Sequence, residues 1–287
     1  MTPRFVTLLC VVLVAFAANS ILNRLALTGT DTGPASFAAL RMVSGAAMLV
    51  LLVASRDKTI GAVTDRLSAR DGWQMAATLL LYVVGFSFAY LSLDAGLGAL
   101  ILFGGVQITM LAGALIAGER LTLRRQTGAG IAFAGLTWLL WPQGAAAPPL
   151  GGAVLMLAAA LGWGLYSLLG RGVGDALGAT AAAFLLASPP VLLLGLVLRD
   201  GLDLPGAALA ILSGAVTSGM GYALWYSLLP RLEASAAGVA QLSVPVIAAL
   251  GGVLILHEPL SLRLIGASAL VIGGVAWSLS QPRAGKT

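Results

Sequence analysis

Ten long apolar runs constrain the fold of this chain more than any other feature of its sequence. Each run has at least 18 residues, enough for a helix to cross the roughly 30 Å hydrocarbon core of a bilayer. Barrel strands would instead alternate polar and apolar residues over about ten positions. The runs cover residues 4–27, 33–54, 73–93, 95–118, 125–142, 150–170, 175–198, 206–229, 234–256 and 264–281. We therefore expect an all-α integral membrane protein with ten transmembrane helices.

The composition and the N-terminus fit this expectation. Hydrophobic residues make up 59% of the chain and charged residues 9%, whereas soluble domains are about 25% charged. The first run begins like a signal peptide, but it extends to Leu27, so we expect a retained helix. The single cysteine, Cys10, lies inside this run, so we expect neither a disulfide nor a thiolate metal site.

The basic residues predict how the chain is oriented. With the N-terminus in the cytoplasm, twelve of the sixteen Lys and Arg residues fall in cytoplasmic segments and three in the opposite loops. This asymmetry is the positive-inside pattern, so both termini are expected in the cytoplasm. It also explains the net charge of +5 without a nucleic-acid partner. The lipid bilayer is the expected partner, and no oligomer is required.

A hexapeptide that occurs twice indicates an internal repeat. "ERLTLR" begins at Glu119 and "EPLSLR" at Glu258, 139 residues later. Each copy follows the fourth run of a five-run unit, and an odd number of spans inverts the second unit. We expect two inverted five-helix repeats, residues 1–142 and 150–287, joined at the linker "PQGAAAPP". Further matches in the same order are Gly128 with Gly266, Gly135 with Gly273, Tyr82 with Tyr222, Phe86 with Tyr226, and Arg24 with Arg171.

These repeated features resemble the drug/metabolite transporter superfamily of the EamA type, whose members have two homologous five-helix halves. The stretches "AYLSLDAGLGALILFGGVQITM" and "LGWGLYSLLGR" most resemble its bacterial aromatic amino acid exporter branch, the YddG type. The resemblance implies an inner-membrane exporter of aromatic and other neutral amino acids that uses no cofactor. One departure is Phe16-Ala17, where the family often begins with a Trp-Gly pair; the second half keeps Trp163-Gly164.

Aromatic residues at helical spacing are the first candidates for a substrate site. Tyr82, Phe86 and Tyr90 are four residues apart and so share one helix face. The alternative is a packing stripe or an interfacial belt, which we expect for the tryptophans near span ends. We predict that a cavity wall is formed by Tyr82, Phe86, Trp163, Tyr166, Tyr222 and Tyr226.

Polar and helix-breaking residues occupy matching positions in the fourth and ninth runs. The pair Gly104-Gly105 aligns with Ser243-Val244, which precedes Pro245, so we expect an interrupted helix at both places. Gln107 and Gln241 could bind the carboxylate and ammonium of a zwitterion, or they could bridge helices. The predicted polar binding residues are Gln107, Gln241, Ser243 and Asn19.

Charged residues inside the runs limit the kind of substrate. Arg41 is the only full charge well inside a run. It is expected to snorkel or to cap a helix end, with anchoring of a substrate carboxylate as the alternative. Every carboxylate lies at a span end, which disfavours cationic drugs and favours a net-neutral substrate. Other neutral metabolites or drugs remain alternatives to amino acids.

An enzyme is the alternative of a different class. An intramembrane hydrolase would need Ser218 and His257, but the stretch around Ser218 lacks the G-x-S-G spacing, and metal and nucleotide motifs are missing. We therefore expect a transporter without enzymatic activity. The pair His257-Glu258 could bind a coupling proton, but we expect it to fix the turn between the last two runs.

Overall fold

The fold is almost entirely helical. The structure is a computed structural model that describes residues 2–67, 69–118, 122–141, 148–171, 173–231 and 240–279. Its helices are α1 (Pro3–Gly29), α2 (Pro34–Asp57), α3 (Gly61–Leu67), α4 (Arg70–Ala89), α5 (Ala95–Ile116), α6 (Leu123–Leu140), α7 (Leu150–Leu169), α8 (Ala176–Leu198), α9 (Leu204–Ile211), the π-helix η1 (Leu212–Met220), α10 (Gly221–Leu228), the 3₁₀-helix η2 (Leu229–Arg231), α12 (Ser243–Leu256) and α13 (Leu262–Leu279). Over the described ranges no strand is present.

Within the described residues, seven helices are long and apolar enough to cross a membrane. They are α1, α2, α4, α5, α7, α8 and the segment Leu204–Leu228, which joins α9, η1 and α10. The helices α12 and α13 are apolar but shorter, and α6 has Arg124 and Arg125 in its first turn. An all-helical membrane fold is thus confirmed, with seven candidate spans. The short helix α3, between α2 and α4, was not predicted.

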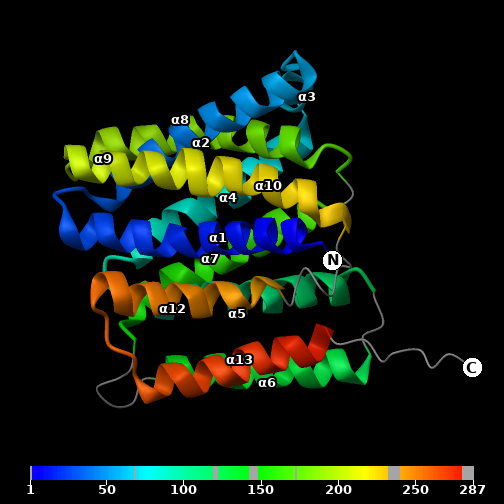
Figure 1. The fold of residues 1–287 in the computed structure, drawn as a ribbon, viewed down its shortest axis with the longest axis vertical. Helices are drawn as coiled ribbons and strands as arrows, with labels where there is room; N and C mark the ends of the chain where they lie inside the picture. The colour runs from blue at the N-terminus through cyan, green and yellow to red at the C-terminus, as the bar shows by residue number, and fades with distance from the viewer. Residues whose placement is uncertain are drawn as a thin grey trace, which may run out of the picture.

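The long helices lie side by side and alternate in direction along the chain (Figure 1). The most extensive helix contacts are those of α6 with α13, α4 with α7, α2 with α8, and α5 with α7, followed by α2 with η1 and α5 with α12. In addition, α1 packs against α12 and against η1. Each of these pairs joins a helix from the first half of the chain to one from the second half. The start of α1 and the end of α13 lie at the same end of the molecule (Figure 1).

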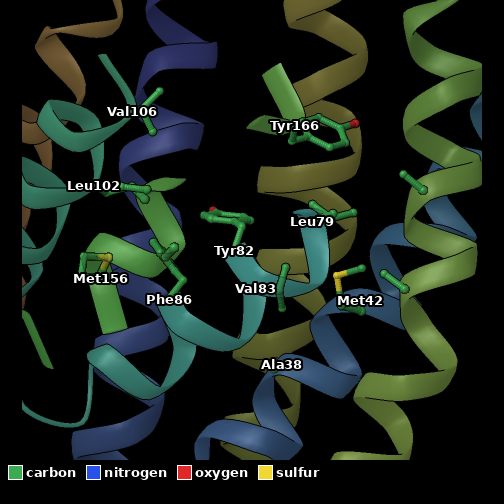
Figure 2. Packing of buried hydrophobic residues seen from close by; sticks show 14 of the residues in the cluster. Ala38, Met42, Leu79, Tyr82, Val83, Phe86, Leu102, Val106, Met156 and Tyr166 are labelled. Atoms are coloured by element: carbon green, nitrogen blue, oxygen red, sulfur yellow. The ribbon is translucent and has the colours of Figure 1, made fainter. Parts of the chain in front are cut away.

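The core is built from large side chains between these pairs and from glycines where helices cross. Figure 2 shows Met42 of α2, Tyr82 and Phe86 of α4 and Met156 of α7 within one buried cluster. Gly85 lets α4 approach α7 closely, since a Cβ there would lie 2.7 Å from the carbonyl oxygen of Leu155. Many leucines and valines on the outside are exposed, as a hydrocarbon solvent allows.

The predicted break at Gly104 and Gly105 is wrong. Both lie within the uninterrupted helix α5. A Cβ on Gly105 would lie 2.7 Å from Cβ of Ala160 in α7. The two glycines therefore allow close helix packing, the other common use of small residues in membrane helices.

The backbone is irregular elsewhere. In the ninth span, Gln241 is helical, Leu242 forms a turn, and α12 begins at Ser243 with Pro245 in its first turn. The first part of this span, residues 232–239, lies outside the described residues. In the eighth span, nine residues form the π-helix η1, which was not predicted. Such π-helical segments occur frequently at functional sites.

Candidate functional site

A cavity of about 880 Å³ lies among the helices of both halves. Its walls come from α1, α4, α5, α7, α8 and α10, among others. Nine of the ten predicted binding residues line it: Asn19, Tyr82, Phe86, Gln107, Trp163, Tyr166, Tyr222, Tyr226 and Gln241. The tenth, Ser243, does not; its hydroxyl donates to the carbonyl oxygen of Ala240, 2.7 Å away within the same segment.

Stacked aromatic rings form one wall of this cavity. The ring of Trp163 stacks on Tyr166 at 5.1 Å and on Tyr222 at 5.5 Å between centroids. Tyr82 lies 5.0 Å from Trp163 in a tilted arrangement. Tyr166 donates a hydrogen bond of 2.8 Å to Thr180, whose hydroxyl also lies 3.1 Å from that of Tyr226. Thr180 therefore orients two of the rings, while Trp163 presents an apolar surface to the cavity.

Two carboxamides face the cavity without bridging helices. The side chains of Gln107 and Gln241 are half-buried and line the cavity. Neither forms a hydrogen bond with another residue in the described part of the chain. The alternative role, a hydrogen bond between helices, is not seen there. Both carboxamides can donate and accept hydrogen bonds toward a bound molecule.

Asn19 is tied to the π-helix. Its Oδ1 accepts hydrogen bonds from the hydroxyls of Ser213, Thr217 and Ser218 at 2.8, 2.7 and 3.3 Å. One amide of α1 thus holds three hydroxyls of η1. Sequence reasoning did not identify these three residues as partners of Asn19. Their signal was the small and polar stretch "SGAVTSGMG" inside an otherwise apolar span.

Arg41 is buried, with 1% of its surface exposed, so the predicted snorkelling or helix-capping role is wrong. Its Nη2 donates to the Tyr82 hydroxyl at 3.2 Å and to the Ser218 hydroxyl at 3.4 Å. The Nε and Nη1 groups are buried and have no partner among the described residues. Its guanidinium also lies 5.0 Å from the centroid of the Phe86 ring. Two cavity-lining rings therefore separate this charge from the cavity.

The charged residues that line the cavity are all basic. They are Arg124, Arg125 and Arg171. Arg124 and Arg125 lie at the start of α6, and Arg171 follows α7, so they mark one end of the cavity. Within the described residues, no Asp or Glu lines it.

A cluster of ion pairs lies at the end of the molecule opposite to these three arginines. The Arg24 guanidinium lies 3.3 Å from Glu258 and 3.5 Å from Asp94, and it donates to the carbonyl oxygen of Tyr90 at 2.8 Å. Glu258 also accepts from the backbone N–H of Ala95 at 2.8 Å. Burial raises the pKa of Glu258. The cluster joins the turn after α12 to α1 and α5, so Glu258 does more than fix its own turn.

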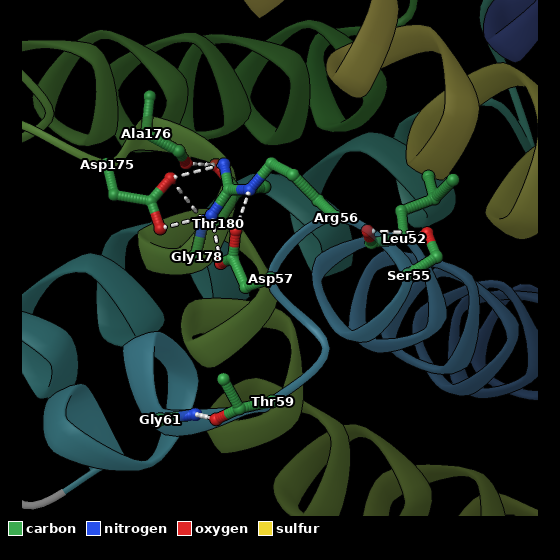
Figure 3. A network of polar contacts seen from close by, with 10 residues as sticks. All are labelled: Leu52, Ser55, Arg56, Asp57, Thr59, Gly61, Asp175, Ala176, Gly178 and Thr180. Carbon is green, nitrogen blue, oxygen red and sulfur yellow. Dashed lines mark hydrogen bonds and ion pairs between the residues drawn. The ribbon is translucent and has the colours of Figure 1, made fainter.

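A second polar cluster connects α2 to α8 at the end of the molecule that carries the basic residues. Figure 3 shows Arg56 between Asp57 and Asp175. Arg56 donates to Asp175 at 2.8 and 2.9 Å and to Asp57 at 2.6 Å. The Arg56 hydrogen bond holds the pKa of Asp175 below its usual value. Asp175 also caps α8 by accepting from the Gly178 N–H.

The two residues that a hydrolase would need are not brought together. Ser218 bonds to Asn19 and Arg41, whereas His257 ends α12 in a left-handed conformation. The described residues also contain no group of three or more side chains able to hold a metal ion.

Comparisons with known proteins give a consistent result. Residues 150–280 match the EamA-like transporter family. The chain is 51% identical over 284 residues to an uncharacterized protein of Pseudomonas aeruginosa. The matched region covers 98% of this chain and 96% of that protein. It is 28% identical over 203 residues to an uncharacterized transporter of Archaeoglobus fulgidus, covering 68% and 71% of the two chains. A crystal structure of a protein 18% identical in sequence shares the fold, with a TM-score of 0.68 over 97% of this chain and 98% of that one.

Proposed function

Because residues 150–280 match the EamA-like transporter family, we propose that the chain is a transporter of this family and that it exports neutral amino acids across a bacterial inner membrane. Aromatic and other apolar amino acids are the proposed substrates, as in the YddG-type branch that the sequence resembles. The observation that carries this proposal is the aromatic wall around Trp163, which faces a cavity of about 880 Å³. Drug-sized ligands occupy cavities of about 300–1,000 Å³, so an amino acid fits with room to reorient.

The proposed mechanism is alternating access between two inverted five-helix repeats, residues 1–142 and 150–287. Two features support it. The most extensive helix contacts join the two halves, so one half can rock against the other around a site between them. The cavity reaches Arg171 at one end, whereas the Arg24 cluster joins α1, α5 and the end of α12 at the other. With both termini in the cytoplasm, this is an inward-facing state.

Each part of the site has a proposed role. The rings of Trp163 and Tyr222 pack against the apolar side chain of the substrate. The carboxamides of Gln107 and Gln241 meet its polar groups. Described carboxylates lie outside the cavity lining, so we propose a downhill export that needs no membrane-buried acid to carry a proton.

The test is counterflow of radiolabelled amino acids in proteoliposomes with purified protein. Trp163→Ala should reduce phenylalanine transport about tenfold, because the substrate loses a ring contact and its buried area. Alanine transport should change little. The matched control is Trp73→Ala, because Trp73 is 56% exposed and does not line the cavity.

Two outcomes would contradict the proposal. Wild-type protein that exchanges no amino acid, but does exchange other neutral metabolites or drugs, would reject the substrate class. Trp163→Ala protein that exchanges phenylalanine like the wild type, at equal amounts in the membrane, would reject the site.

A further inference from the structure

The charge of Arg41 has no counter-charge among the residues that the structure describes. It is 1% exposed, and within the described residues no carboxylate lies within 4.0 Å of it. Its Nε and Nη1 atoms are buried without a partner among the described residues. Burying an unpaired arginine inside a membrane helix is costly. A bound anion nearby would offset part of this cost.

Tyr82 connects this charge to the cavity. Its hydroxyl oxygen accepts a hydrogen bond from Arg41 at 3.2 Å, and its side chain lines the cavity. The proton of the hydroxyl has no acceptor among the described residues, so it is available to a bound molecule. A hydrogen bond accepted from a cation strengthens the O–H group as a donor, because chains of hydrogen bonds polarise one another.

The rest of the cavity also favours a negative group. Among the described lining residues, the charged side chains are Arg124, Arg125 and Arg171. Arg171, at one end of the cavity, adds a positive charge that attracts an anionic ligand. A substrate ammonium would meet neutral groups, such as carboxamide and hydroxyl oxygens and ring faces, because the described lining has no carboxylate.

We propose that the pair Tyr82–Arg41 recognises a carboxylate, and that the cavity takes aromatic monocarboxylates with or without an ammonium group. This rests on the proposed function, because it names the chemical class that the same cavity transports. Tyr82 binds the carboxylate through its O–H group. Arg41 is a positioning residue that orients this hydroxyl and supplies the positive charge. The aromatic end of the molecule packs against Trp163.

Three ligands that share one aromatic ring test the proposal. We would measure their binding to the purified full-length protein in detergent by isothermal titration calorimetry at pH 7. Phenylalanine carries both charged groups, 3-phenylpropionate only the carboxylate, and phenethylamine only the ammonium. Phenylalanine and 3-phenylpropionate should bind within about tenfold of each other. Phenethylamine should bind at least about tenfold more weakly, the loss expected for a charge-assisted hydrogen bond.

The ligands separate this proposal from the proposed function. Binding of phenylalanine alone would overturn the proposal and leave amino acid export standing. Binding of 3-phenylpropionate alone would support the role of the carboxylate, but it would overturn the part of the proposal that admits an ammonium group and would remove amino acids as substrates. Phenethylamine binding as tightly as 3-phenylpropionate would overturn the role of the carboxylate. Binding of none of the three would overturn both.

Variants then assign the effect to the two residues. Tyr82→Phe keeps the ring and removes the hydroxyl, so 3-phenylpropionate should bind about tenfold more weakly while phenethylamine is unaffected. The control is Tyr90→Phe at the C-cap of the same helix, because the Tyr90 hydroxyl bonds to the Ala95 carbonyl oxygen and Tyr90 does not line the cavity. Equal loss for both ligands in Tyr82→Phe would overturn the assignment.

Arg41 is tested by a ratio of two affinities, the affinity for 3-phenylpropionate divided by that for phenethylamine. Arg41→Gln should lower the ratio of the two affinities about tenfold, and Arg41→Lys should restore part of it because the charge remains. If Arg41→Gln does not fold, Arg41→Lys and Tyr82→Phe still decide the matter. An unchanged ratio in folded Arg41→Gln would show that the charge plays no part.

Discussion

The contact between η1 and α2 gives a stability prediction with a definite sign. A Cβ placed on Gly214 would lie 2.1 Å from both the Arg41 carbonyl oxygen and the Ser44 hydroxyl oxygen. Real Cβ contacts essentially never fall below 3.0 Å, so the two helices would have to separate by about 0.9 Å (3.0 − 2.1). Ser44 can rotate away, but the carbonyl belongs to the backbone of α2.

The expected cost of Gly214→Ala follows from two opposing effects. Overpacking in a buried contact costs about 1–3 kcal/mol, and a backbone obstacle favours the upper end of this range. Replacing glycine by alanine in a helix stabilises it by about 1 kcal/mol. We therefore expect a net loss of about 2 kcal/mol in the free energy of unfolding, measured by titrating mixed micelles with a denaturing detergent.

The matched control is Gly130→Ala in α6. A Cβ there would meet nothing within 4 Å, so only the helix preference of alanine acts, and stability should rise by up to about 1 kcal/mol. The two substitutions should therefore shift the transition in opposite directions. A Gly214→Ala protein as stable as Gly130→Ala would refute the close approach of η1 to α2.

Three other predictions test the topology and the polar clusters. In a Cys10→Ala background, whole cells treated with an impermeant thiol reagent should label Leu262→Cys but not Leu123→Cys, although both positions are exposed; labelling of both would contradict the inverted orientation. Burial raises the pKa of Glu258, so the folded state binds this proton more readily than the unfolded chain. The stability that this proton contributes is present below pH ~4.5 and is lost as pH rises through the raised pKa. Thermal unfolding of Glu258→Gln, measured over the same pH range, should not show this loss. The pKa of Asp175 is lowered, so its contribution has the opposite sign: it is present above pH ~3.8 and is lost on further acidification. Asp175→Asn should be less stable than the wild type at neutral pH and should lose less stability in acid, and equal acid profiles would exclude this role.

Features that depend on local sequence could be predicted well. The run at 150–170 corresponds to α7, Leu150–Leu169, and the run at 125–142 to α6, Leu123–Leu140. The spacing of Tyr82 and Phe86 placed both rings on one helix face, and both line the cavity. Hydrophobic length and helical period are properties of a single segment, so one sequence contains them in full.

Features that depend on distant partners could not be predicted. A glycine pair in a membrane helix can break the helix or allow close packing, and at Gly105 the choice depends on Ala160 in another helix. The π-helix is held by Asn19, almost 200 residues earlier in the chain. Arg41 likewise finds its partners on α4 and η1. In each case the deciding contact joins elements that the sequence alone does not bring together.

The position of these unpredicted features bears on what they do. A π-helix has poorer packing than an α-helix, and a buried guanidinium without a counter-charge is destabilising. Apolar residues would fill the same space at lower cost. Yet both features meet at Ser218, which bonds to Arg41 on one side and to Asn19 on the other, and Asn19 and Tyr82 line the cavity. Natural proteins accept local cost mainly at functional sites. We therefore attribute the destabilising features around Ser218 to a requirement of the cavity. That requirement is a fixed positive charge that contacts the Tyr82 hydroxyl.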